Sequence, residues 1–254
     1  FVDCSGTGTV TGVSTALANP ADFCGDDPTV GAVCYVFGNQ TQDATAFVTF
    51  PYESGITVLN DNEGVEDPPY IPEAQDLDIG SVWGMAYQPA TDSVFLAAFM
   101  KRHVGFLEPT DDATGTIFRI DRTTGNITEF LNLNDLFGAG TTGANPHPFL
   151  TNTDPPTPNF EDDQGAGWDG VGKIAFGDLQ LSHDQRTLYV VNLFDRSLYS
   201  MPIGTNDPFN PYGPVAPAAG QIGVFPMNDT TLPGLPCAAT WDNDLRPGAL
   251  GIYN

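Results

Sequence analysis

Residues 79–131 decide the fold, and they read IGSVWGMAYQPATDSVFLAAF, then MKRHVGFLEPTDDATG, then TIFRIDRTTGNITEFL. Residues 82–87 alternate between two faces, and the apolar, β-rich run 93–99 returns after the turn Gln-Pro-Ala-Thr-Asp. Residues 116–121 form a third run, and residues 127–131 form a fourth after the tight turn Arg-Thr-Thr-Gly-Asn. Four short antiparallel strands joined by turns predict one meander sheet, which is the unit of a β-propeller blade.

The same pattern returns downstream as an internal repeat. GMAYQPATDSVFLAAF (84–99) aligns with GDLQLSHDQRTLYVVNL (177–193), and GTIFRID (115–121) aligns with RSLYSMPI (196–203). Repetition of a supersecondary unit is typical of radial or stacked arrays. The sequence therefore predicts an all-β fold, a β-propeller-like array of antiparallel four-stranded blades with long loops, in a ring that can be incomplete.

The chain of 254 residues is long enough for one large all-β domain with an ample core. We expect a single β-propeller-like domain over residues 1–254, with a turn-rich, disulfide-stapled N-terminal arm at 1–35 and the blades at 36–254. Two polar segments, 53–75 and 138–172, are interpreted as exposed loops. A loop as long as the second one is commonly functional.

The charge balance excludes several classes of partner. The chain has 8 Lys and Arg against 32 Asp and Glu, a formal net charge of -24. Such a surface repels phosphate backbones and anionic lipid headgroups, so we expect no nucleic-acid binding. No apolar run approaches the ~20 residues that span a bilayer, so we expect no membrane insertion. The first residues carry no secretion signal and are typical of a mature or trimmed start.

Cysteines and sequons point outside the cell. The four cysteines are Cys4, Cys24, Cys34 and Cys237. They show no zinc spacing, and three of them fall in a region with few large apolar residues, so at least one disulfide is expected, with three connectivities open. N-glycosylation sequons begin at Asn39, Asn126 and Asn228, although chance accounts for such triplets equally well. Together these features favour an extracellular or cell-surface location.

Residues 161–169 bring hard oxygen ligands together in a loop. The weak calcium candidates there are Asp162, Asp163 and Asp169. Calcium takes six to eight oxygens in flexible geometry, but the spacing matches no known calcium loop, so a solvated acidic loop is the favoured interpretation. A second, equally weak candidate consists of Asp61, Asn62 and Glu63.

Other polar residues have both a functional and a structural interpretation. Lys101, Arg102 and His103 form the one dense basic cluster, which either binds an anionic glycan or carboxylate or, as we favour, pairs with nearby carboxylates. Those carboxylates are Glu108, Asp111 and Asp112. A catalytic metal held by His103, His147 and His183 is disfavoured because His147 lies in a Pro-flanked loop and His183 in a turn. No serine-hydrolase elbow and no phosphate-binding glycine loop is present.

Three positions inside or near strands carry structural expectations. Asp178 lies within an expected strand, where we expect it to cap backbone amides near a propeller channel. Trp83 and Tyr189 lie in the repeated strands, so both are expected to pack between blades. Residues 249–253 are expected to be the first strand of a new blade. An unpaired strand edge invites a partner, which residues 7–13, residues 46–50, a continuing chain or a neighbouring copy could supply.

Several phrases carry a family resemblance. They are VFGN (36–39), DATAFVTFPY (43–52), IGSVWGMAYQPATDSVFLAAFMKRHVGF (79–106), GTIFRID (115–121), GKIAFGDLQLSHDQRTLYVVNLFDRSLY (172–199) and DLRPGALGIYN (244–254). They resemble the propeller-like region of secreted bacterial cell-surface proteins, which precedes immunoglobulin-like stalk repeats. The resemblance implies an extracellular display or adhesion role and supplies no catalytic residues. It does not extend to a stalk or to the two long loops.

Three functions from different classes follow. The favoured one is a non-catalytic extracellular module for adhesion or display, whose partners are cell-surface proteins, glycans or other copies of itself. The first alternative is a structural subunit of an extracellular filament or surface layer. The second is a calcium-dependent propeller enzyme of the lactonase or sugar-dehydrogenase type, which rests on analogy of architecture alone.

Overall fold

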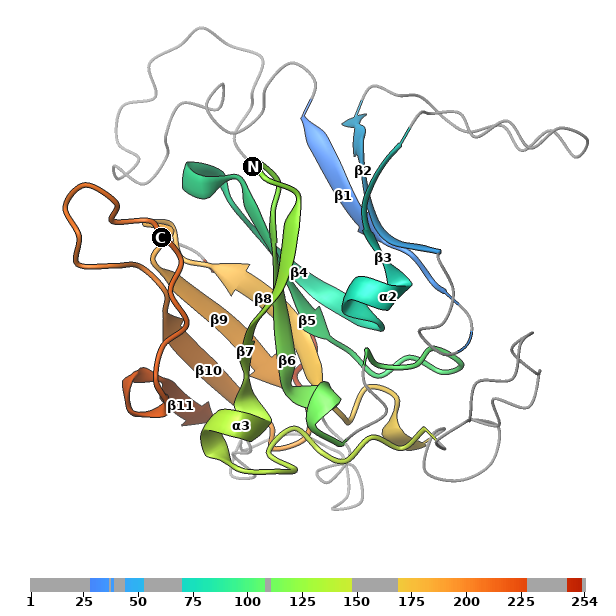
Figure 1. The fold of residues 1–254 in the computed structure, drawn as a ribbon. Helices are drawn as coiled ribbons and strands as arrows, with labels where there is room; N and C mark the ends of the chain where they lie inside the picture. Colours follow the sequence, from blue (N-terminus) through green and yellow to red (C-terminus); the bar gives the residue numbers. More distant parts are fainter. Residues whose placement is uncertain are drawn as a thin grey trace, which may run out of the picture.

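The computed structural model describes residues 28–36, 38, 44–52, 70–107, 111–147, 169–227 and 246–252. Within these ranges the protein is built from three antiparallel sheets of three, four and four strands, with a few short helices (Figure 1). The predicted all-β class is therefore confirmed. The described sheets form no closed barrel.

The first sheet has the order β1-β2-β3. Its strands are β1 (Thr29–Val33), β2 (Thr45–Pro51) and β3 (Ile71–Gln75). The third strand corrects the prediction of an exposed loop over residues 53–75, because Ile71–Gln75 pairs with β2 along the sheet edge. Pro72 and Glu73 break the apolar alternation, but a proline is tolerated in an edge strand, and Ala74 is buried. This sheet has three described strands, where a four-stranded blade was expected.

The second sheet confirms the meander predicted from residues 79–131. Its strands are β4 (Val82–Gln88), β5 (Ser93–Ala98), β6 (Thr116–Asp121) and β7 (Asn126–Asn132), in the order β4-β5-β6-β7. The short helix α2 (Asp76–Ile79) leads into β4, and α3 (Leu133–Phe137) follows β7. Single 3₁₀ turns occur at Pro89–Thr91, Asp111–Gly115 and Ala219–Gln221.

The third sheet confirms that the pattern repeats. Its strands are β8 (Phe176–Leu181), β9 (Thr187–Asn192), β10 (Ser197–Pro202) and β11 (Gly223–Pro226), in the order β11-β10-β9-β8. Each four-stranded sheet therefore runs along the sequence from one edge strand to the other. In both sheets the first strand, β4 or β8, lies at one edge.

The second sheet is the middle layer, and its strand β5 is buried on both faces. Every residue of β5 is buried. Val94 and Leu96 pack in the core shared with the first sheet, whereas Phe95 and Ala97 pack in the core shared with the third. Because successive side chains of a strand point to opposite faces, a strand between two cores must be apolar throughout. This explains the continuous apolar run in the sequence.

The edge strands β4 and β8 touch backbone to backbone. A Cβ atom added at Gly84 would lie 2.4 Å from the carbonyl oxygen of Gly177, a distance that no real side chain tolerates. A Cβ atom added at Gly177 would in turn lie 2.8 Å from the carbonyl oxygen of Gly248. Glycine is thus required at both positions for close approach, and residues 246–252 lie beside β8.

Residues 246–252 differ from the expected strand, because the described residues there adopt no strand structure. The amide of Asp178 donates to the carbonyl of Gly248 at 3.0 Å, but the amide of Leu250 donates to the Asp178 carboxylate at 3.1 Å. A side chain therefore accepts a bond that a ladder would direct to a backbone carbonyl. Asp178 does cap a backbone amide, as expected. Residues 46–50 pair within the first sheet and residues 7–13 lie outside the described ranges.

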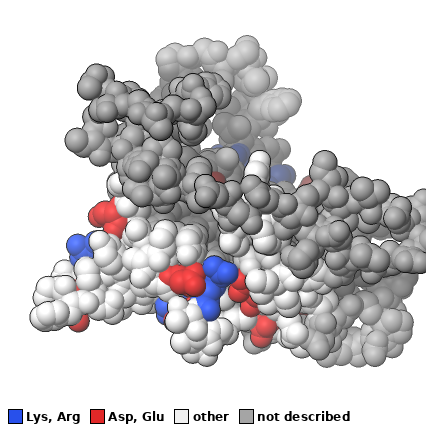
Figure 2. Space-filling model, turned by 90° about the horizontal axis from the view of Figure 1, so that it is seen from above, with Lys and Arg blue, Asp and Glu red and all other residues white. Residues whose placement is uncertain are grey.

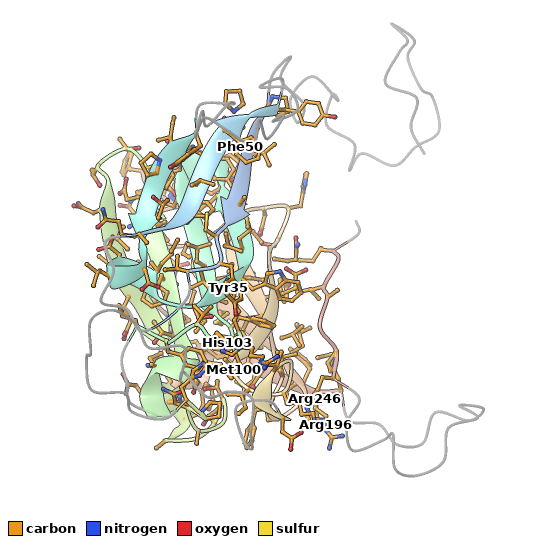
Figure 3. The ribbon with its side chains drawn as sticks, turned by 90° about the vertical axis from the view of Figure 1, so that its right-hand side faces the viewer. Tyr35, Phe50, Met100, His103, Arg196 and Arg246 are labelled. Carbon is orange, nitrogen blue, oxygen red and sulfur yellow. The ribbon has the colours of Figure 1, made fainter. Side chains whose placement is uncertain are left out.

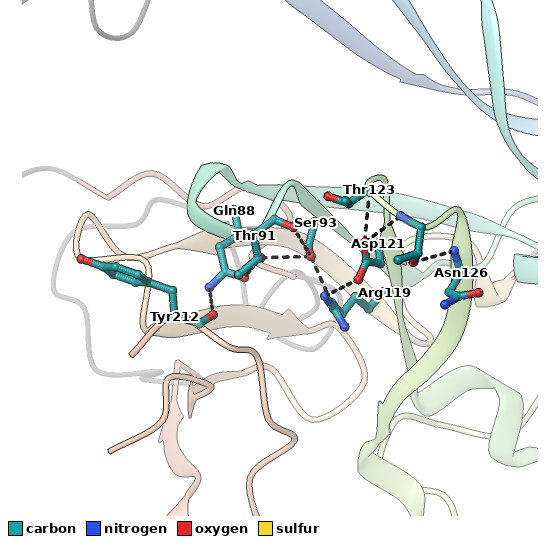
Figure 4. Close-up of polar contacts among 9 residues, drawn as sticks. Gln88, Thr91, Ser93, Arg119, Asp121, Thr123, Asn126 and Tyr212 are labelled. Atoms are coloured by element: carbon teal, nitrogen blue, oxygen red, sulfur yellow. Dashed lines mark hydrogen bonds and ion pairs between the residues drawn. The ribbon is translucent and has the colours of Figure 1, made fainter. Parts of the chain in front are cut away.

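A chain of polar side chains links the second and third sheets where their strands end (Figure 4). The buried Gln88 donates through Nε2 to the carbonyls of Gln185 and Tyr212, at 2.9 and 3.0 Å. The Thr91 hydroxyl donates to the side-chain Oε1 of Gln88 at 2.6 Å. Ser93 accepts a bond from Arg119, whose guanidinium also pairs with Asp121. Satisfied buried polar groups of this kind fix how two elements meet.

Trp83 is not a core residue, so the prediction that it packs between blades is wrong. Its side chain is 44% exposed, and its ring packs on Phe99 with the centroids 5.0 Å apart. Trp83 and Tyr87 are the two exposed positions of β4, so Trp83 is not packed between the sheets. Tyr189 is half-buried. The inter-sheet aromatic anchor is Phe95 instead.

Candidate functional site

A groove opens between the first and second sheets. Its volume is about 390 Å³, and it lies between β1, β2 and β4. Phe47, Met85 and Val94 form an apolar wall, and Phe47 and Val94 are themselves buried. A concave, largely apolar site with a few polar groups is the usual form of a ligand pocket, which typically has ~300–1,000 Å³.

The polar side of the groove is an ion-pair network around Arg122. Its Nε donates to Glu73 and its Nη1 to Asp92, both at 3.0 Å. Tyr87 donates its hydroxyl to the same oxygen of Asp92 at 3.0 Å. Thr49 donates to Glu73 at 2.6 Å. Arg122, Tyr87 and Thr49 line the groove, so three elements hold its polar groups in fixed positions.

Turn geometry explains how these side chains meet. Asp92 has a left-handed backbone (φ 45°) in the β4–β5 turn, and Gly125 (φ 74°) occupies the β6–β7 turn. Aspartate and glycine are the residues that accept such conformations most readily. The amide of Arg122 donates to the Asp92 carbonyl at 2.9 Å, which joins the two turns.

The electrostatics of the network favour its charged form. Burial opposes the charge of Arg122, but the hydrogen bond and charge of Glu73 and the charge of Asp92 outweigh it and raise the Arg122 pKa. Burial and the neighbouring Asp92 raise the pKa of Tyr87, so its hydroxyl stays a donor. On the face seen in Figure 2, charged side chains of the described residues lie in small groups of mixed sign.

A second cluster lies beneath the first sheet. The Asp76 side chain is fully buried, and neither carboxylate oxygen has a hydrogen-bond partner in the described part of the chain. Burial raises the Asp76 pKa to about 7, against the opposing influence of Lys101. Burial lowers the Lys101 pKa to about 8, although Cys34 and Asp76 oppose the shift. Burial also raises the pKa of the Cys34 thiol.

The basic cluster 101–103 is not one exposed patch. Lys101 is half-buried and its Nζ donates to the Cys34 carbonyl at 3.3 Å, which corrects the idea that it faces an anionic ligand. The Tyr35 hydroxyl donates to the Arg102 carbonyl, and Figure 3 shows Tyr35 near the turn that carries His103. The side chains of the expected ion-pair partners Glu108, Asp111 and Asp112 lie outside the described ones.

The histidines do not converge in the described part of the chain. His147 is buried with its ring 5.9 Å from that of Phe106, whereas His183 is exposed. The described residues contain no group of three or more His, Cys, Asp or Glu that could hold a metal ion. Asp169 is exposed. The other calcium candidates, Asp162, Asp163, Asp61, Asn62 and Glu63, lie outside the described ranges, so calcium binding stays a prediction.

Only some of the predicted disulfide and glycosylation residues lie within the described ranges. Cys34 has a free thiol in the structure, which differs from the expectation that it is bridged. Cys4, Cys24 and Cys237 lie outside the described ranges, so a disulfide among them stays a prediction. Asn126 is exposed where β7 begins, which is compatible with glycan attachment. Asn39 and Asn228 lie outside the described residues.

Sequence reasoning missed the groove and its network. Glu73, Asp92 and Arg122 come from three separate segments and lie close together only after the sheets pack. A local signal existed for Arg122, because it follows an aspartate in a Thr-Thr-Gly turn and so stands at a strand end. Nothing in the sequence identified its partners.

The fold and groove define an all-β protein of packed antiparallel sheets with a ligand-sized recess at their edge. No family model matches the chain. It is similar to three proteins of Dictyostelium discoideum: Colossin-B (25% identical over 77% of this chain), Colossin-D (27% over 77%) and Colossin-C (26% over 78%).

The relatives are far longer than the matched region. The chain spans 4% of Colossin-B, 20% of Colossin-D and 18% of Colossin-C. The similarity therefore concerns one part of each relative. These matches do not bear on the expected resemblance to bacterial surface proteins. Among the described helices, none has the length and apolar character that crossing a bilayer requires.

Proposed function

We propose that this chain is a non-catalytic extracellular module for adhesion or display, which holds ligands in the groove between its first and second sheets. The observation that carries the proposal is the groove itself. An apolar wall faces a polar network whose members are already fixed by one another, as in a preformed binding site. Its charged groups serve to orient a ligand.

The acidity of the chain supports an extracellular role. A formal net charge of -24 keeps the module soluble and away from anionic polymers and headgroups. Similarity to one part of much longer proteins supports a module that acts within a larger chain. The free Cys34 thiol gives no support to an oxidising compartment, so the location rests on the other features.

We also infer a propeller-like arrangement of the sheets. The support is two successive close backbone contacts, one between Gly84 and Gly177 and one between Gly177 and Gly248. Each of these glycines is the first residue of a similar phrase, namely Gly-Met-Ala-Tyr, Gly-Asp-Leu-Gln and Gly-Ala-Leu-Gly. In this arrangement β4 and β8 are successive inner strands, and residues 246–252 occupy the next inner position without strand structure.

Bead adhesion tests the function directly. The folded chain is coupled to fluorescent beads, and retention on cells and on glycan-coated surfaces is measured under flow. Beads with the heat-unfolded chain and beads with an acidic protein of equal charge are the controls. We expect retention only with the folded chain, and no turnover of lactone or sugar substrates. Equal retention on all beads, or measurable turnover, would contradict the proposal.

A further inference from the structure

We propose that the groove binds a neutral hexose residue of a glycan, through the ring face of Tyr87 and the guanidinium of Arg122. This inference rests on the proposed binding function and adds the chemical class of the ligand. A pyranose presents an apolar C–H face and a rim of neutral hydroxyl groups. The groove offers a matching surface for each.

The apolar half of the site combines a fixed aromatic ring with a buried wall. Tyr87 is 48% exposed at the groove, and its hydroxyl bond to Asp92 holds the ring in one orientation. Met85 and Phe47 continue the apolar surface inward. A rigid aromatic ring provides contact area at little entropic cost, because few rotamers are lost on binding.

The polar half of the site has hydrogen-bonding capacity to spare. Arg122 uses Nε and Nη1 for its two carboxylate partners, and a hydrogen bond from its guanidinium to the Tyr87 hydroxyl opposes the raised pKa of Tyr87. A guanidinium has five N–H donors, so it has donors beyond these to offer a sugar hydroxyl. Thr29 and Thr49 add hydroxyl groups to the groove lining, and the Thr49 hydroxyl already donates to Glu73.

Charge selects a neutral sugar over an acidic one. The single positive charge of Arg122 lies between Glu73 and Asp92, so the network carries one net negative charge. The whole chain, this network included, carries a formal net charge of -24. An anionic sugar would be repelled at this site, whereas neutral hydroxyl groups can both donate to carboxylates and accept from a guanidinium. The cavity of about 390 Å³ suits a short saccharide.

Binding is tested by NMR titration of the ¹⁵N-labelled chain. The probes are glucose, galactose and mannose, their neutral oligosaccharides, and glucuronic acid as the anionic counterpart. We expect at least one neutral hexose to shift the amides of Thr49, Tyr87 and Arg122, with Kd on the order of millimolar for the monosaccharide. Tighter binding of the oligosaccharide would identify a glycan chain rather than a free sugar as the ligand.

Two variants give the test its control. Tyr87→Ala removes an exposed ring and should weaken hexose binding about tenfold with the melting temperature nearly unchanged. Phe209→Ala removes another exposed ring, 94% accessible and outside the groove, and should change neither. The proposal is overturned if no neutral hexose or oligosaccharide shifts the groove amides, if glucuronic acid binds as well, or if Tyr87→Ala binds like the parent.

The bead assay separates this inference from the function on which it rests. Retention that neither Tyr87→Ala nor free hexose reduces would leave adhesion standing and overturn the hexose site. Hexose binding in the titration, without any bead retention, would instead overturn adhesion and support the site.

Discussion

At the scale of single residues, Asp76 conflicts most clearly with the rest of the fold. Its carboxylate is fully buried, and both oxygens are without a hydrogen-bond partner in the described part of the chain. A buried carboxylate without hydrogen bonds is costly in its ionised form, which is why its pKa is raised from 3.8 to about 7. Its amide, by contrast, is satisfied by the Ala44 carbonyl at 2.8 Å.

The raised pKa predicts a stability that falls as pH rises. Between 3.8 and about 7 the unfolded chain loses the Asp76 proton while the folded chain keeps it, so the free energy of unfolding decreases across this window. Asp76→Asn should remove most of that decrease and stabilise the protein near neutral pH by ~1–4 kcal/mol, with little effect below the lower value. Denaturant unfolding at a series of pH values measures this.

Lys101 gives the control for that experiment. Its pKa is lowered to about 8, so its own contribution to stability rises with pH from about 8 toward 10.5 and does not overlap the Asp76 window. Parallel pH profiles of the parent and Asp76→Asn below neutral pH would refute the assignment of the decrease to Asp76.

Trp83 and Phe95 test which aromatic residue is structural. Phe95 is fully buried between the second and third sheets, so Phe95→Ala should cost about 3–5 kcal/mol. Trp83 is 44% exposed and contacts Phe99 at one edge of its surface, so Trp83→Ala should cost only about 1 kcal/mol. Chemical denaturation of both variants decides, and equal losses would show that Trp83 is a core residue after all.

At the scale of elements, β4 and β8 depend on glycine for their contact. Gly84→Ala places a methyl group 2.4 Å from a backbone oxygen that cannot rotate away, so the strands must separate. We expect a loss of ~2–4 kcal/mol from strain and lost packing. Gly177→Ala should act similarly, and the longer distance of 2.8 Å from its methyl group to the Gly248 oxygen should give a smaller loss.

Gly220→Ala is the matched control. A Cβ atom there would meet no described atom within 4 Å, so the variant should unfold within about 0.5 kcal/mol of the parent. If Gly84→Ala were as stable as Gly220→Ala, the backbone contact between β4 and β8 would not exist in solution.

How far the elements follow from the sequence depends on how local their signals are. β4 to β7 were predictable because the alternation, the turns and the apolar run of β5 all lie within residues 79–131. β3 was missed because Pro72 and Glu73 obscure a strand that only pairing with β2 stabilises. The exposure of Trp83 was unpredictable because both faces of β4 carry apolar residues.

The groove could not be predicted from the sequence, because its residues come together only when the sheets pack. Its apolar wall combines Phe47 with Met85 and Val94, from strands of two different sheets. The carboxylates that hold Arg122 come from β3 and from the β4–β5 turn. Long-range packing, rather than any spacing along the chain, brings these residues together.

At the scale of the whole molecule, we propose that the sheets form a continuing array through their inner strands. The second sheet is stabilised from both faces, by one core shared with the first sheet and another shared with the third. Beyond β8, residues 246–252 contact Gly177 and Asp178, which is where we propose that the array continues. The contact between β8 and residues 246–252 therefore offers the most direct test of the array.

Hydrogen exchange at the Asp178 amide tests it most directly. This amide lies on the edge of β8 that faces away from β9, and it donates to the Gly248 carbonyl at 3.0 Å. It should therefore exchange slowly, at a rate within about tenfold of that of the Val190 amide in the centre of the third sheet. Deleting residues 246–254 should expose the Asp178 amide and leave Val190 protected. Rapid exchange of the Asp178 amide in the intact chain, or protection that survives the deletion, would contradict the account.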